Sequence, residues 1–304
     1  MVCKAIFIAL IASAFVFPCI LAVFTDDFKD FLIDSYGLKA ANKLERLDLG
    51  PGRLGSFGGK ENGSEPIKKQ PIIFVHGLTK RAGYWIQNLG FFKGKGYTSG
   101  ELYATSYGDG AVGFVVKSVS NCENVKQVRR FIEAVHNYTN SKVDIIGHSL
   151  GGAMSRKAIL GGKCVDTMED LGGPLTDMVD TYISLAGVAY GSERCPYLFL
   201  SNCNKNNGFD CRSDFIHDIN EPNYRYQGDY SYYIWSHDDH IIGDDCCGHL
   251  CPEVKNATSF SENYGYNHFS IVPKTVDIQY SMLTDHVVIK KESPNNLHGG
   301  FLRK

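Results

Sequence analysis

The stretch VDIIGHSLGGA, residues 143–153, decides how the rest of this 304-residue chain is interpreted. An apolar run ends, a single serine follows, and glycines and helix-forming residues come next. The pattern fits G-x-S-x-G with Gly147, Ser149 and Gly151, which is typical of a tight strand-to-helix turn that exposes its serine above a sheet. An ordinary turn without chemistry is the alternative. We favour a reactive serine, because this motif requires an apolar strand before it and a helix after it.

Segments with strand and helix patterns alternate on both sides of this turn. Strands are predicted at residues 71–78, 101–107, 142–147, 181–187 and 230–236. Helices are predicted at residues 25–47 with a break at Gly37, 124–138, 152–160 and around 272–283. The glycine-rich residues 50–65 are interpreted as a surface connection. The alternation predicts an α/β fold, a mostly parallel sheet with helices on both faces.

The charge of the chain excludes one class of partner. The formal net charge is -2, and the lysines and arginines are scattered along the sequence instead of forming a basic stripe. Proteins that bind nucleic acid need such a stripe to neutralise phosphates. We therefore expect no nucleic-acid partner.

The N-terminus predicts export from the cell. Lys4 precedes an uncharged apolar run, and small residues follow near Ala22, which is the layout of a secretory signal peptide over residues 1–22. The run is also long enough to cross a bilayer, so a retained signal-anchor is the alternative. Three N-x-S/T sequons, at Asn62, Asn137 and Asn256, are glycosylation candidates that agree with a secreted, extracellular protein.

The cysteines agree with export as well. Eight follow the predicted signal peptide and are disulfide candidates: Cys122, Cys164, Cys195, Cys203, Cys211, Cys246, Cys247 and Cys251. Eight cysteines allow 105 pairings, and the sequence does not choose among them. We expect the disulfides between residues 195 and 251 to brace the rim of a substrate pocket, because these segments follow strands at the carboxyl edge of the sheet. Residues 197–200, YLFL, are either a lipid-facing edge or part of the core.

A serine hydroxyl is a weak nucleophile, so it needs a base and donors for the oxyanion that its attack creates. The turn itself positions the main-chain amide of Leu150. A second amide is expected from the loop VHGLTK after the first core strand, where His76-Gly77 turns the chain so that Leu78 faces the same point. Leu78 and Leu150 are therefore the candidate oxyanion hole. His76 and His148 are expected to pack near the site without a chemical step.

The segments PIIFVHGL, ELYATSY and KVDIIGHSLGGA resemble the class 2 triacylglycerol lipase family, and the match in order and spacing covers about residues 71–282. The resemblance implies an α/β-hydrolase fold and an acyl hydrolase without a cofactor that uses Ser, Asp and His in chain order. This chain would be a secreted, eukaryotic-type member with extra cysteines. Its domains would be a signal peptide at 1–22, an N-terminal extension at 23–70 and a catalytic domain at 71–304.

The acid is expected after the strand at residues 230–236, where Asp238 and Asp239 are both available. The two carboxylates should point in opposite directions, so that only one can orient the base. The family pattern, an acid followed by one residue and two aliphatics, favours Asp239, since His240, Ile241 and Ile242 follow it.

The base should follow the acid along the chain. His268 lies before the final helix, where the family has an equivalent histidine, and we expect it to be the base. His240 is too close to Asp239, and His249 lies among cysteines. His286 follows the last helix, and His298 sits in a polar tail. The predicted catalytic residues are Ser149, Asp239 and His268.

The predicted function is hydrolysis of carboxylic esters of lipids through an acyl-enzyme on Ser149, with a lipid or small ester as substrate and transient contact with lipid interfaces. A phospholipase, a thioesterase or an acyltransferase would use the same chemistry, and a lipid-binding protein without activity is a further alternative. Residues 237–251, HDDHIIGDDCCGHLC, contain metal-ligand types, but oxidised cysteines would not bind a metal. We expect neither a metal nor a cofactor.

Overall fold

The computed structural model describes residues 23–50, 54–110, 120–195 and 201–289. The predicted signal peptide, residues 197–200 and His298 lie outside the described residues. Within the described part of the chain, no helix combines the length and the apolar character that spanning a bilayer requires.

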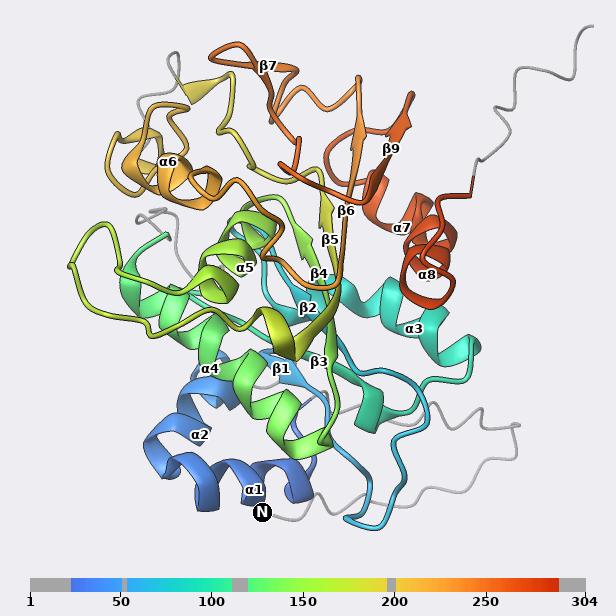
Figure 1. Ribbon diagram of the computed structural model, residues 1–304. Helices are drawn as coiled ribbons and strands as arrows, with labels where there is room; N and C mark the ends of the chain where they lie inside the picture. Colours follow the sequence, from blue (N-terminus) through green and yellow to red (C-terminus); the bar gives the residue numbers. More distant parts are fainter. Residues whose placement is uncertain (1–22, 51–53, 111–119, 196–200, 290–304) are drawn as a thin grey trace, which may run out of the picture.

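A seven-stranded sheet forms the centre of the molecule (Figure 1). From one edge to the other its strands are β1 (Ser56–Phe57), β3 (Leu102–Thr105), β2 (Ile72–Val75), β4 (Val143–His148), β5 (Val179–Leu185), β6 (Tyr230–Ser236) and β9 (Ser259–Asn263). Strand β1 pairs antiparallel with β3, and every other pairing is parallel. The mostly parallel sheet predicted from the sequence is confirmed.

Helices cover both faces of the sheet, as the sequence predicts (Figure 1). One face carries α1 (Asp26–Tyr36), α2 (Leu38–Glu45), α4 (Cys122–Thr139), α5 (Leu150–Leu160) and α6 (Asp214–Asn220). The other carries α3 (Ile86–Gly94), α7 (Ile271–Lys274) and α8 (Val276–Thr284). Within β2, Ile73 and Val75 face the first group and Ile72 and Phe74 face the second. Because successive side chains of a strand alternate between faces, this apolar run buries both.

Residues 23–50 pack against the core instead of standing apart from it. Thr25 caps α1 through its hydroxyl, and Gly37 separates α1 from α2, which confirms the predicted helices and break. The ring of Phe28 lies 5.3 Å from the ring of Tyr103 in β3 and 4.7 Å from that of Tyr138 in α4. The first two helices thus share one apolar cluster with the sheet.

The structure corrects two of the predicted segments. Residues 55–59 are buried and contain β1, so the interpretation of residues 50–65 as a surface connection is wrong there. The predicted final helix is two helices, α7 and α8, which Thr275 separates. The sequence patterns do not predict strand β9, helix α3 or helix α6.

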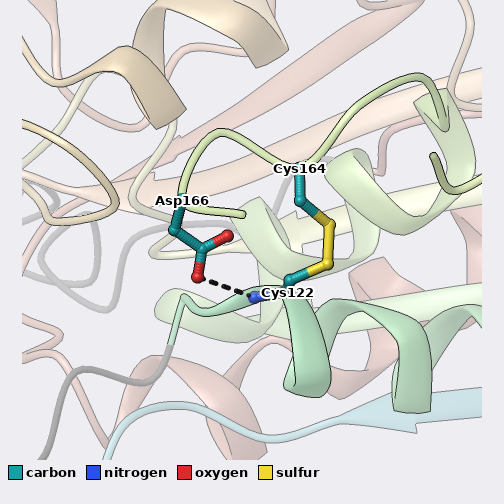
Figure 2. Close-up of side chains that lie close together, drawn as sticks. All are labelled: Cys122, Cys164 and Asp166. Atoms are coloured by element: carbon teal, nitrogen blue, oxygen red, sulfur yellow. Dashed lines mark hydrogen bonds between the residues drawn. A yellow bond between two sulfur atoms is a disulfide. The ribbon is translucent and has the colours of Figure 1, made fainter. Parts of the chain in front are cut away.

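All eight cysteines after the predicted signal peptide are in disulfides: Cys122–Cys164, Cys195–Cys203, Cys211–Cys247 and Cys246–Cys251. The first joins the start of α4 to the loop after α5, and Asp166 of that loop accepts a hydrogen bond from the main-chain N–H of Cys122 at 3.0 Å (Figure 2). The other three lie between β5 and β9 along the chain, and two of them, Cys211–Cys247 and Cys246–Cys251, involve the hairpin of β7 (Asp245–Cys246) and β8 (His249–Leu250).

Candidate active site

Ser149 lies in a strained turn between β4 and α5. Its φ of 56° and ψ of -126° place a non-glycine residue outside the common regions of backbone space. The turn is held by its neighbours, because the Ser149 N–H donates to the carbonyl of Leu185 at 2.9 Å. A Cβ atom on Gly151 would lie 2.2 Å from the carbonyl oxygen of Val75, so only glycine lets α5 start this close to β2. Ser149 as a whole is 7% exposed.

The loop after β2 passes directly beside this serine. A Cβ atom on Gly77 would lie 2.8 Å from the Cβ of Ser149. The next residue, Leu78, is half-buried, and no acceptor binds its amide among the residues that the structure describes. Thr79 then takes a φ of 58°, a left-handed conformation that is uncommon for threonine. Leu150 is the first residue of α5, so its amide has no partner within the helix.

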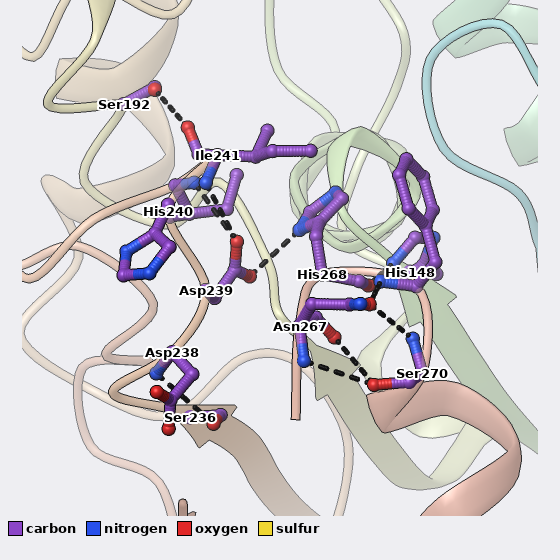
Figure 3. Close-up of polar contacts among 12 residues, drawn as sticks. His148, Ser192, Ser236, Asp238, Asp239, His240, Ile241, Asn267, His268 and Ser270 are labelled. Carbon is purple, nitrogen blue, oxygen red and sulfur yellow. Dashed lines mark hydrogen bonds and ion pairs between the residues drawn. The ribbon is translucent and has the colours of Figure 1, made fainter. Parts of the chain in front are cut away.

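Asp239 and His268 form a buried pair (Figure 3). The Asp239 Oδ2 and the His268 Nδ1 are 2.7 Å apart, and each side chain is 5% exposed. The other carboxylate oxygen of Asp239 accepts the main-chain N–H groups of Ile241 and Ile242 at 3.0 and 3.2 Å. A carboxylate only accepts hydrogen bonds, so we assign the ring proton of His268 to Nδ1, which leaves Nε2 as a free base.

Ser149 follows β4, Asp239 follows β6 and His268 follows β9. In the sheet these strands stand in the order β4, β5, β6 and β9, so the three residues lie at the same edge. Within the described residues no hydrogen bond joins the hydroxyl of Ser149 to His268. In free enzymes such contacts are often long and tighten when substrate binds. The two loops still touch, because the Nε2 of His148, the residue before Ser149, is 2.8 Å from the main-chain oxygen of His268 (Figure 3).

Two other histidines support these loops as neutral groups. Burial lowers the pKa of His76 to about 4 and holds the pKa of His148 well below its usual value. The Nδ1 of His76 donates to the carbonyl of Gly77 at 2.8 Å, and its Nε2 accepts the main-chain N–H of Tyr107 at 3.1 Å. His76 therefore fixes the turn that presents Leu78. The sequence predicted that both histidines pack near the site but not these contacts.

The alternative candidates from the sequence lie elsewhere. Asp238 is exposed and accepts the N–H of Gly265. His240 is exposed, and His249 stacks on Tyr190 with 4.2 Å between ring centroids. His286 stacks on Tyr230, the first residue of β6, at the amino ends of the strands. The structure pairs none of them with Asp239 among the described residues.

One group of three potential metal ligands occurs among the described residues, namely Cys122, Cys164 and Asp166 (Figure 2). Its two sulfurs form a disulfide, which lacks the thiolates that bind metals. The cysteines of residues 237–251 are also oxidised. The cysteines of both stretches therefore cannot serve as thiolate ligands.

Comparison with known proteins gives one family and a fold. The model of the lipase (class 2) family matches residues 69–281. Aspergillus fumigatus lipase B has a similar structure, with a TM-score of 0.55 and 17% identity over 76% of this chain, which spans 56% of that protein. Bacillus licheniformis lipase BlEst2 in its mature form gives a TM-score of 0.50 and 17% identity over 77% of this chain and 98% of its own. At such identities the two structures establish the α/β-hydrolase fold alone.

Proposed function

The chain belongs to the class 2 lipase family, and from this premise we propose that it is a serine hydrolase that cleaves carboxylic esters of lipids. Family membership supports lipid ester hydrolysis in general. The observation that carries the finer proposal is the buried contact of 2.7 Å between Asp239 and His268, in a loop that touches the residue preceding the strained Ser149.

In the proposed mechanism His268 takes the proton of the Ser149 hydroxyl through Nε2 as the oxygen attacks the ester carbonyl. Asp239 fixes the tautomer of His268 and stabilises the imidazolium that forms. The amides of Leu78 and Leu150 bind the oxyanion, and the positive end of α5 adds to that stabilisation. His268 then gives the proton to the leaving alcohol. Water, activated by the same histidine, hydrolyses the acyl-enzyme.

We also propose that the chain is exported and carries N-linked glycans. Four disulfides support an oxidising compartment. Asn62, Asn137 and Asn256 are all exposed, as glycan acceptors must be. Sequencing the N-terminus of the mature protein tests the export, since an intact Met1 would contradict cleavage of a signal peptide.

The test of the mechanism is substitution of Ser149. Ser149→Ala should lower kcat for a short-chain nitrophenyl ester by at least about 10⁴-fold, because the nucleophile is gone while the oxyanion hole remains. The variant should also lose labelling by a fluorophosphonate and keep the circular dichroism spectrum of the wild type. Near-normal turnover would end the assignment of Ser149.

The two neighbouring acids provide a matched pair. Asp239→Asn should reduce kcat by about 10³-fold or more, whereas Asp238→Asn should change it little, because only Asp239 orients the base. Equal losses in the two variants would contradict the assignment.

A phospholipase, a thioesterase or an acyltransferase would label in the same way, and substrate profiling separates these activities. A lipid-binding protein without activity would not label at all.

A further inference from the structure

Lys80 is fixed next to the proposed oxyanion hole. Its main-chain N–H donates to the carbonyl of Gly77 at 3.2 Å and closes a turn over residues 77–80. The same turn contains the amide of Leu78 and the left-handed Thr79. The position of Lys80 is therefore set by the loop that also lies against Ser149.

The side chain of Lys80 extends toward the base. Its Nζ lies 4.5 Å from the ring centroid of Phe269, the residue after His268, and 5.5 Å from that of Tyr84. Aromatic faces attract cations at such distances, so the two rings hold the ammonium group beside the loop of His268. Phe269 is 45% exposed, so this contact lies at the solvent-accessible edge of the site.

Among the described residues Lys80 forms no ion pair, so no acid neutralises its positive charge there. Five other lysines do pair with acids: Lys29, Lys43, Lys126, Lys142 and Lys157. The carboxylate of Asp239, the acid of the proposed site, is buried and bound to His268. A free cation at the rim of a partly desolvated site attracts anions.

The side of the substrate that meets this cation follows from the chemistry, and this step rests on the proposed function. His268 donates its proton to the leaving alcohol, so the alcohol part of the ester must lie beside the ring of His268, whose centroid is 5.2 Å from that of Phe269. Lys80 contacts Phe269 and thus lies on that side. We propose that Lys80 is a specificity residue that favours esters whose alcohol part carries a negative charge, such as the phosphate of an acylglycerol phosphate.

The test compares two esters that differ only in this charge. A short-chain 1-acylglycerol 3-phosphate and the 1-acylglycerol with the same acyl chain are assayed below their critical micelle concentrations, so that no lipid surface is present. Lys80→Met should lower the ratio of kcat/KM values, phosphate ester over neutral ester, by about tenfold, whereas Lys80→Arg should retain it. Raising the salt concentration should shrink the ratio in the wild type.

A lysine elsewhere serves as the matched control. The Nζ of Lys95 lies 5.2 Å from the ring of Phe91 and 5.0 Å from that of Tyr280, at the end of α3. Lys95→Met removes a similar two-ring contact and should leave the ratio unchanged. An ester with a carboxylate in place of the phosphate shows whether any anion suffices, and faster hydrolysis than the neutral ester supports the charge effect.

Two outcomes would overturn the inference. An unchanged ratio in Lys80→Met would show that the charge does not select substrate. Equal losses of kcat/KM for both esters would show that Lys80 only stabilises the packing of its own loop against the loop of His268. If the wild type hydrolyses neither ester and does not react with a fluorophosphonate, the proposed function itself fails, which is a different result.

Discussion

His76 shows how a single buried residue links the site to the stability of the fold. Its ring holds the turn at Gly77 with one nitrogen and the N–H of Tyr107 with the other, and the ring stacks on that of Tyr107 at 4.2 Å. The contact with the Tyr107 N–H requires the neutral imidazole, because it uses the lone pair of Nε2, and burial lowers the pKa of His76 to about 4.

The pKa of His76 predicts a loss of stability in mild acid. Above pH 6.5 the imidazole of His76 is neutral in both the folded and the unfolded state. Between pH 6.5 and 4 it is protonated in the unfolded state and stays neutral in the folded state. The free energy of unfolding should therefore fall as the pH drops from 6.5 to 4, by about 3 kcal/mol from this residue. Urea titrations across that range should show a shallower dependence in His76→Gln, and identical slopes would refute the assignment.

At the level of single residues, the sequence predicts a feature where local spacing carries the information. The turn at Ser149 follows from a pentapeptide and its flanks, and the resemblance to the family favoured Asp239 over Asp238 as partner of His268, which is how the structure pairs them. The contact of His148 with the carbonyl of His268 joins residues 120 positions apart, which no local pattern encodes.

At the scale of elements, two buried cations on α5 hold α6 in place. The Nη2 of Arg156 donates to the carbonyl of Ile219 at 2.5 Å, at the end of α6. The Nζ of Lys157 lies 2.7 Å from Asp218 Oδ2 and donates to the carbonyl of Gly161 at 2.9 Å. Because α5 begins directly after Ser149, these contacts connect the disulfide-rich region to the helix that follows the proposed nucleophile.

Removal of one partner of the ion pair between buried Lys157 and half-buried Asp218 should lower stability more than removal of both. Lys157→Met leaves the carboxylate of Asp218 uncompensated and should lower the free energy of unfolding by about 2 kcal/mol, and Lys157→Met/Asp218→Leu should recover much of that loss. Lys142→Met, at the exposed pair with Asp229, should move the urea midpoint much less. If the double variant lost as much free energy of unfolding as Lys157→Met and Asp218→Leu lose together, the two residues would not be coupled.

The elements that the sequence missed are short or lie at the edges of the sheet. Strand β1 has two residues, and its glycine-rich surroundings resemble a loop. Strand β9 buries one of its five side chains, Ser261, so it lacks the apolar alternation that identifies a strand. β1 becomes a strand because it pairs with β3, and β9 because it pairs with β6. These pairings depend on the tertiary structure, so a local sequence pattern does not predict them.

At the scale of the whole molecule, the disulfides divide into two kinds. Cys122–Cys164 spans 42 residues and ties α4 to the loop after α5. The other three span 8, 36 and 5 residues, all between residues 195 and 251. That stretch includes Asp239, and neighbouring residues hold its loop directly, since Ser192 donates to the carbonyl of Ile241 at 2.9 Å (Figure 3).

The longer loop should contribute more to global stability. In the chain-entropy model, Cys122→Ser/Cys164→Ser should lower the free energy of unfolding by about 4 kcal/mol, against about 2.5 kcal/mol for Cys195→Ser/Cys203→Ser. Urea unfolding without reductant measures both losses. The second variant should instead lose relatively more activity, because the N–H of Cys195 donates to the carbonyl of Ser192 at 3.0 Å, and Ser192 holds the loop of Asp239. Losses of stability and of activity in the reverse order would contradict this division.

The placement of β9 also has a consequence during biosynthesis. In the proposed mechanism the base follows β9, which is the last strand along the described chain and forms one edge of the sheet, whereas the nucleophile follows β4. During synthesis the proposed nucleophile, Ser149, is therefore made before its proposed base, His268. If the chain is exported as proposed, it would gain activity toward the lipids of the membrane that it crosses only after β9 has joined β6 and the segment up to His268 has folded.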